Sequence, residues 1–340
     1  MLYIVIIFLL VSIYLYCLLG GADFGAGIVE FFTFKKEKER IRNLTSEAIA
    51  PIWEANHMWV VISVVILFNA FPGIYTQVSI SLYIPLILLL IGIVLRGSAF
   101  VFRHYDAIKD ESQSVYSKIF EFSSVMVTFF FGLIIGALIS GKIVINPTNY
   151  IDGYITPWLN IFSVSIGIFL CALFSFIASI YLIGDTTNAD DRLLCIKKAK
   201  YSTVSVVVAG GLVFISSFIE HIDLAERFFT HPISIAMILI ATAALPLLWR
   251  TLNKGSIWES RILAGAQLLF ILGGFYAIFF PTVVSIKNSE NLTLFNSAAP
   301  DITLNYLGWS LIIGSFIIFP SLYYLFKVFK FHDNKETKAN

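Results

Sequence analysis

Charged residues are scarce in this sequence. Only 13% of its 340 residues are Asp, Glu, Lys or Arg, whereas 58% are hydrophobic and the mean hydropathy is +0.85. A soluble globular domain carries about 25% charged residues. The net charge of +1 leaves no basic field that would attract nucleic acid. The composition excludes a soluble domain and a nucleic-acid partner, and it predicts a membrane protein.

Several chemical signatures are also missing. The cysteines, Cys17, Cys171 and Cys195, lack the Cys-x-x-Cys spacing of a zinc, iron–sulfur or redox site. The sequence has no phosphate-binding loop, HExxH zinc pair, nucleophile elbow or haem-attachment motif. No basic residue precedes Lys35, so we expect the first apolar run to stay as a transmembrane helix and not to act as a cleaved signal peptide. The chain therefore lacks the catalytic and cofactor-binding motifs that are typical of a stand-alone enzyme.

Long apolar runs recur along the whole sequence, each able to cross a hydrocarbon core of about 30 Å. They predict an all-α polytopic membrane protein of about nine transmembrane helices, which we expect to form two four-helix bundles plus one peripheral helix. We expect one transmembrane domain over residues 1–330 and a short cytoplasmic tail over 331–340. The predicted spans are 2–30, 48–70, 79–102, 118–140, 157–184, 201–220, 232–250, 258–284 and 306–328.

The basic residues divide unevenly between the two sets of loops that nine spans create. One set holds 19 of the 23 lysines and arginines, the other holds Lys142, Arg227 and Lys287, and Arg96 lies inside a span. Cytoplasmic loops carry the excess of basic residues. We therefore predict an external N-terminus and a cytoplasmic C-terminus. A missed span would have spread the charges over both sides, so the split also supports the number of spans.

Ionisable residues inside the spans indicate functional sites or buried pairs, because a charge in lipid costs at least a few kcal/mol. Asp23 lies among small residues, where Gly21 and Gly25 have the spacing that lets helices approach closely. We expect Asp23 to face protein, either as a proton-relay or gating carboxylate or as an acid that only hydrogen-bonds a neighbouring helix. Arg96 must pair with a carboxylate or reach the interface, and structural pairing is favoured.

The second predicted span begins with an unusually polar segment. Glu54 and His57 are three residues apart and share a helix face, and Glu47, seven residues before Glu54, extends this file toward the basic loops. Such a file suits proton transfer; the alternative is an amphipathic helix buried against a partner. The proton-transfer candidates are Glu54, Asp23, His57 and Glu47, and the candidates for structural and subunit packing are Trp53, Asn56, Trp59, Arg96, Gly21 and Gly25.

Other polar and small residues are interpreted as structural. A bis-histidine haem site would need a second histidine at membrane depth beside His57. The other histidines lie at or beyond the ends of the spans; they are His104, His221, His231 and His332. We therefore expect this chain to bind no haem or metal. Glu220 is expected to be a solvated residue at a helix end. Paired glycines predict tight helix packing; they are Gly132 and Gly136, Gly210 and Gly211, and Gly273 and Gly274.

Three motifs in order resemble subunit II of the cytochrome bd quinol oxidase family, in its short-looped, cyanide-insensitive branch. They are Ala-Asp-Phe-Gly-Ala-Gly at 22–27, Pro-Ile-Trp-Glu-Ala-Asn-His-Met-Trp at 51–59 and Arg-Gly-Ser-Ala-Phe at 96–100. Residues 280–281 and 298–304 are similar to the penultimate loop of that family. Val101 and Asp185 depart from it, standing where the family often has an acid and a Glu.

The resemblance implies a heterodimer in a bacterial cytoplasmic membrane. Subunit I would bind two b-type haems and haem d, oxidise quinol and reduce dioxygen, while this chain, which carries no haem, would support it and contribute to the cytoplasmic proton supply. In some members subunit II holds a structural quinone, which makes quinone a candidate ligand beside membrane lipid. Two alternatives remain: a proton-coupled secondary transporter, and a purely structural membrane scaffold whose buried acids are packing pairs.

Overall fold

The chain is almost entirely helical. The structure, a computed structural model, describes residues 1–49, 53–105, 112–184, 186 and 188–330. Within these residues nine helical spans are long and apolar enough to cross a membrane, which confirms the predicted architecture. They are formed by α1 (Leu2–Leu15), the π-helical turn η1 (Tyr16–Gly20) and α2 (Gly21–Phe31) in continuation, then α4 (Trp53–Ala70), α6 (Tyr83–Tyr105), α7 (Ser112–Ile139), α9 (Ile161–Gly184), α10 (Ala189–Ile219), α12 (Pro232–Lys254), α13 (Ile257–Phe279) and α14 (Asp301–Lys330).

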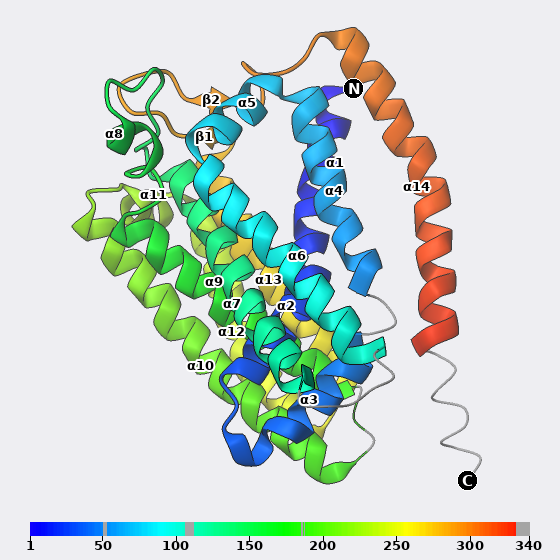
Figure 1. Cartoon of the computed structure of the whole chain (residues 1–340). Helices are drawn as coiled ribbons and strands as arrows, with labels where there is room; N and C mark the ends of the chain where they lie inside the picture. The colour runs from blue at the N-terminus through cyan, green and yellow to red at the C-terminus, as the bar shows by residue number, and fades with distance from the viewer. Residues whose placement is uncertain (50–52, 106–111, 185, 187, 331–340) are drawn as a thin grey trace.

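Short elements gather toward the end of the molecule that holds the N-terminus (Figure 1). They are α5 (Pro72–Ser81), α8 (Tyr150–Tyr154), α11 (Leu224–Thr230), β1 (Thr282–Val284) and β2 (Leu292–Thr293). The two strands form an antiparallel pair. We call this end the hairpin end. The opposite end carries α3 (Lys35–Ile49), and we call it the α3 end.

Several predicted span boundaries differ from the observed helices, most of all at the sixth span, whose helix begins at Ala189 and not at residue 201. Residues 48 and 49, predicted to open the second span, belong to α3, and within the described residues this span begins at Trp53. The eighth span ends at Phe279, because residues 282–284 pair as a strand. The tail predicted at 331–340, with His332, and Asp185 lie outside the described residues.

Helix α9 is the centre of the packing. It is the most buried of the spans, and α2, α7, α10 and α13 all pack against it. A Cβ added at Gly25 would lie 1.9 Å from the carbonyl oxygen of Phe174, and one at Gly132 would lie 2.6 Å from the Cα of Gly167. Only glycine permits such close backbone contact. The first bundle (α1–α2, α4, α6, α7) and the second (α9, α10, α12, α13) meet here, and α14 stands at the edge beside α1 and α4 (Figure 1).

The glycine pairs do not all serve helix packing. Gly136 and Gly273 have close neighbours, since added Cβ atoms would lie 2.6 Å from the Cα of Ser163 and 2.8 Å from the sulfur of Met237. The prediction was wrong for the pair on α10: a Cβ at Gly211 would have no neighbour within 4 Å, and one at Gly210 would be 3.5 Å from Phe169. These two glycines line a cavity instead.

Candidate functional site

A carboxylate and a guanidinium pair inside the first bundle. Arg96 on α6 donates from its two terminal nitrogens to the two carboxylate oxygens of Asp23 on α2, at 2.9 and 2.8 Å, and also to the Asp23 backbone carbonyl at 2.9 Å. Its Nε donates to Ser124 Oγ on α7 at 3.0 Å. Asp23 is 2% exposed and Arg96 1%. The pair is therefore bidentate, buried and oriented by three helices.

The local sequence explains this placement. In a helix of 3.6 residues per turn, Asp23 points away from the face shared by Gly21 and Gly25. That glycine face lies against Phe174 of α9, so the carboxylate is turned toward α6. The π-helical turn just before α2 adds a residue to one turn and resets the face that follows. The expected close approach at the two glycines and the burial of Asp23 are both observed.

His57 on α4 is the third member of this group. Its Nε2 lies 3.7 Å from Asp23 Oδ2, which is too long for a hydrogen bond but within ion-pair distance when the imidazole is protonated. Its side chain is 20% exposed, and its Nδ1 has no hydrogen-bond partner among the described residues. The ring centroid lies 5.4 Å from that of Phe24 and 6.3 Å from that of Trp53. We call Asp23, His57 and Arg96 the Asp23 site.

The other two proton-transfer candidates lie elsewhere. Glu54 is exposed on the surface of α4, three residues before His57, and does not join the Asp23–Arg96 pair. Glu47 lies near the end of α3, and the described residues do not include the connection to α4. Glu47 thus stands on α3, and Glu54 and His57 stand on α4, so one continuous helix through all three is not seen in the described residues, and the proton-transfer role of the file stays a prediction. The polar segment belongs to two helices, of which only α4 is apolar enough to span.

The predicted packing residues of α4 line its inner side. Asn56 and Trp59 are buried. The Trp59 ring lies 6.2 Å from that of Phe319 on α14, and its Nε1 has no hydrogen-bond partner within the described ranges. Trp53 packs on Phe100 of α6, with ring centroids 5.6 Å apart. These residues hold α4 between α6 and the peripheral helix α14.

A second charged cluster, which the sequence analysis did not identify, lies at the α3 end. Arg103 Nη1 donates to both carboxylate oxygens of buried Glu30, at 2.9 and 3.0 Å. Two residues of α3 donate to the same carboxylate: Arg42 at 3.0 Å and Thr45 at 3.1 Å. Glu121 of α7 accepts from Lys38 at 2.6 Å. We call these six residues the α3 network. The sequence spacing could have revealed this cluster. Glu30 lies seven residues, or two helical turns, after Asp23, and Arg103 lies seven residues after Arg96, so the second acid and arginine can pair as the first two do.

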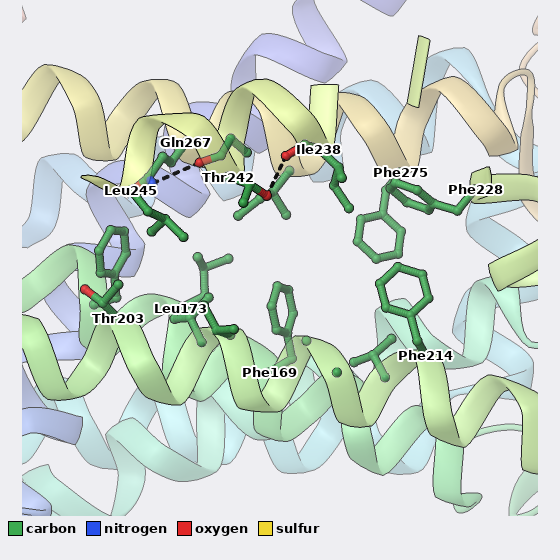
Figure 2. A pocket seen from close by; sticks show the side chains of 18 residues that line it. Phe169, Leu173, Thr203, Phe214, Phe228, Ile238, Thr242, Leu245, Gln267 and Phe275 are labelled. Carbon is green, nitrogen blue, oxygen red and sulfur yellow. Dashed lines mark hydrogen bonds between the residues drawn. The ribbon is translucent and has the colours of Figure 1, made fainter. Parts of the chain in front are cut away.

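An apolar cavity lies within the second bundle. It has a volume of about 240 Å³ and lies between α9 and α10 on one side and α12 and α13 on the other (Figure 2). Gly211 and Thr242, at its edge, are exposed on the outer surface of the chain. Gln267 of α13 lines it: its Nε2 donates to the Ala241 carbonyl at 3.2 Å, and its buried Oε1 has no partner among the described residues. Figure 2 shows the rings of Phe169, Phe214 and Phe275 around the remaining space.

These features define a polytopic membrane subunit that buries paired acids and arginines between its helices. Within the described residues no three His, Cys, Asp or Glu side chains are grouped as a metal site. The chain belongs to the cytochrome bd terminal oxidase subunit II family, whose model matches residues 1–329. It is therefore a subunit of a quinol oxidase complex, as the sequence motifs predicted, and the transporter and scaffold alternatives are not favoured.

Individual relatives agree. The chain is 26% identical over 323 residues to cytochrome bd ubiquinol oxidase subunit 2 of Bacillus subtilis (strain 168), covering 91% of this chain and 90% of that one. It is 30% identical over 83 residues to cytochrome bd-I ubiquinol oxidase subunit 2 of Escherichia coli (strain K12), covering 24% of this chain and 21% of that one. The bd oxidase structure from Geobacillus thermodenitrificans shares the fold, with a TM-score of 0.73, 17% identity, and coverage of 95% and 99% of the two chains.

Proposed function

We propose that this subunit II docks on a haem-binding subunit I through the face of α4 that exposes Glu54, and that Glu54, His57 and Asp23 conduct protons toward the oxygen site of that partner. The partner would hold the two b-type haems and haem d, oxidise quinol and reduce dioxygen. Reduction of dioxygen to water consumes one proton for each electron. A reaction centre surrounded by lipid must receive those protons through titratable groups or ordered water.

The Asp23 site is the observation that carries this proposal. Arg96 engages both oxygens of Asp23, so the carboxylate keeps one orientation. The His57 imidazole lies beside it with Nδ1 available, and can accept or release a proton next to a fixed negative charge. Glu54 lies one helical turn from His57 on the outer surface of α4. A partner that covers this surface would shield Glu54 from lipid, so that protons could pass from Glu54 to His57 and Asp23 and from there toward the oxygen site.

The orientation of the chain in the membrane decides from which side the protons enter. We propose that the α3 end faces the cytoplasm and the hairpin end faces outward across the cytoplasmic membrane of a bacterium. The uneven distribution of basic residues supports this orientation, since α3 alone carries Lys35, Lys36, Lys38, Arg40 and Arg42. Glu47, near the end of α3, then remains a candidate for the first acceptor on the cytoplasmic side.

Glu54→Gln in the purified two-subunit complex tests the function. The variant should assemble with full haem content but lose about tenfold or more of its quinol oxidase turnover, because Gln keeps the shape and cannot titrate. Glu54→Asp should retain most of the turnover. Glu226→Gln, at an exposed acid on α11, is the matched control and should behave as wild type. Normal turnover of Glu54→Gln across the pH range would show that this acid is structural.

We also propose that the cavity of the second bundle holds a structural quinone. The apolar lining suits an isoprenoid tail, and the unpaired Oε1 of Gln267 suits the hydroxyl of a reduced ring. Its outer edge at Gly211 and Thr242 faces the region that lipid would occupy.

Solvent extraction of the purified complex tests this ligand. Wild type should release an equimolar quinone, and Gly211→Leu, which fills open space in the cavity, should release much less. Ala243→Leu places a leucine of the same size on the exposed face of α12, outside the cavity lining, and should retain the quinone. Equal quinone content in all three proteins would contradict the assignment.

A further inference from the structure

A buried aromatic ring separates the two charged clusters. Phe120 of α7 is fully buried, and the guanidinium carbons of Arg96 and Arg103 lie 4.7 and 4.2 Å from the centre of its ring. One ring thus contacts both an arginine of the Asp23 site and an arginine of the α3 network. Cation–π contact stabilises each guanidinium without offering a proton acceptor.

Three more aromatic residues extend this level across the first bundle. Phe24 of α2 lies 4.8 Å from the Arg96 guanidinium, Phe100 of α6 lies 5.9 Å from the Phe120 ring, and Trp53 of α4 lies 5.6 Å from Phe100. Phe24 and Phe100 are buried. We call Phe24, Trp53, Phe100 and Phe120 the aromatic layer. It contains one residue from each of the four spans that surround the Asp23 site.

The gap between α2 and α7 is narrow at this level. A Cβ added at Gly27 would lie 2.2 Å from Ser124 Oγ and 3.2 Å from the Phe120 ring. Gly27 lies midway between Asp23 and Glu30 on α2. The Ser124 and Phe120 side chains of α7 thus pack directly on the α2 backbone between the positions of the two acids.

The carboxylates of the α3 network are already engaged. Glu30 accepts from Arg103, Arg42 and Thr45, and Glu121 accepts from Lys38, with Arg42 at 3.5 Å. Each of these carboxylates contacts two cations, whereas Asp23 contacts one guanidinium and has Oδ2 near His57. The network therefore presents no carboxylate oxygen to a neighbour that titrates near neutral pH. The network instead connects α3 to α2, α6 and α7.

We infer that the aromatic layer closes the interior route from the α3 network to the Asp23 site, so that protons pass this level on the outer face of α4, at Glu54. Glu54 follows Trp53 directly and so lies at the depth of the layer, but it points outward. This inference rests on the proposed proton-supply function and assigns a positioning role to Phe120. It also removes Glu30 from the proton route, although Glu30 is buried two turns from Asp23.

Glu30→Gln in the purified two-subunit complex is the first test. Turnover per haem and its pH profile should stay within about twofold of wild type, a change too small for a lost proton carrier. Glu121→Gln, which weakens the same network from α7, should give the same result and provides a second readout if Glu30→Gln assembles poorly. A turnover loss in these variants as large as that of Glu54→Gln, with a shifted pH profile, would overturn the inference.

Opening the layer is the second test. In the Glu54→Gln background, Phe120→Ser places a hydroxyl and room for water between the clusters and should restore several-fold turnover, measured per haem. Phe120→Leu keeps the level apolar and should restore none. Equal rescue by both substitutions, or no rescue by Phe120→Ser, would overturn the inference. A Glu54→Gln variant without any defect refutes the proposed function instead, and the Glu30→Gln result is still judged against wild type.

Discussion

Arg96 uses all of its donor nitrogens inside the protein. Nε bonds Ser124, and the terminal nitrogens bond the carboxylate and carbonyl of Asp23, while rings of Phe24 and Phe120 cover its flat faces. Removing either charge of such a pair leaves the other charge buried without compensation. The bidentate contact therefore predicts that Asp23 is important for assembly, whatever its part in proton transfer.

Arg96→Ala should reduce the amount of assembled complex more than the turnover of each assembled complex. The uncompensated Asp23 carboxylate should cost roughly 3–5 kcal/mol of folding free energy. The measurement is haem-containing complex per milligram of membrane protein, followed by turnover per haem. Arg227→Ala, at an exposed residue of α11, is the control and should assemble normally. Normal yield with lowered turnover would instead give Arg96 a direct role in proton transfer.

Glu220 should make the hairpin end sensitive to acid. Burial raises the pKa of this carboxyl, but the Lys142 ammonium and the Ile161 N–H, at 3.0 Å, outweigh it and lower the pKa below its ordinary value. A lowered pKa in the folded state contributes stability above the ordinary carboxyl value of about 4.3, and that stability is lost as the pH falls through the lowered value.

Glu220→Gln should therefore lower the Tm of the complex at neutral pH and flatten its decline in acid. The measurement is Tm of the detergent-solubilised complex between about pH 6 and pH 3, a range that covers ordinary carboxyl titration. Glu226→Gln, at an exposed acid of α11, should leave the wild-type pH dependence unchanged. An identical acid decline in wild type and Glu220→Gln would remove Glu220 as its cause.

The sequence predicted some of these contacts and not others, for a physical reason. Asp23 and Arg96 lie deep in apolar runs, where an ionisable residue needs a partner, so burial and pairing followed directly. Glu30 and Arg103 lie at the ends of such runs, where water is the simpler expectation, and only the tertiary position of α3 buries them. The sequence also did not reveal that Glu54 is exposed, because which face of α4 packs against other helices is known only from the folded chain.

At the scale of helices, α9 sets the tolerance for substitution. Gly25 faces the backbone of Phe174 with no room for a methyl group, so the α2–α9 contact depends on glycine. The paired glycines of α10 looked the same in the sequence but face the cavity. The spacing of small residues shows that they share a helix face but not whether another helix packs on that face. The prediction of close packing was therefore right for Gly25 and wrong for the glycine pair of α10.

Gly25→Ala should destabilise the complex. The added Cβ would overlap the Phe174 carbonyl and force α2 away from α9, with an expected cost of about 1–3 kcal/mol, as for other overpacked cores. Assembled yield and Tm measure the effect. Gly314→Ala on α14 adds the same methyl group where no atom lies within 4 Å and should behave as wild type. Equal yields from the two variants would mean that α2 moves aside at little cost.

Helix α3 was not predicted, because its many charged residues make the segment resemble a loop between spans, although Ile41, Leu44 and Ala48 repeat at helical spacing and pack against the core. Its stability comes from ion pairs that join it to distant spans, including Arg40 with Asp191 and Lys198 with Glu37, beside the contacts of the α3 network. Only the folded chain brings these charges together. The nine spans, in contrast, followed from apolar length and from the distribution of basic residues.

At the scale of the whole molecule, the odd number of spans places the described end of α14 at the α3 end and the N-terminus at the hairpin end (Figure 1). Reporters fused after Asn340 or inserted between residues 32 and 34 should be cytoplasmic, and one inserted near Tyr150 should be external. Alkaline phosphatase activity and a cytoplasmic fluorescent reporter at each site measure this. Phosphatase activity at residues 32–34 would reverse the proposed orientation.

The two acids of the first span and the two arginines of the third have a consequence for biosynthesis. Glu30 can pair early with Arg42, but Asp23 leaves the ribosome about 70 residues before Arg96, so the nascent first span carries a carboxylate that has no counter-charge while the second span is being made. An unpaired carboxylate in lipid costs at least a few kcal/mol. The first span should therefore remain beside the insertion machinery until the third arrives, and the pairing of charges should set the order in which the growing chain enters the bilayer.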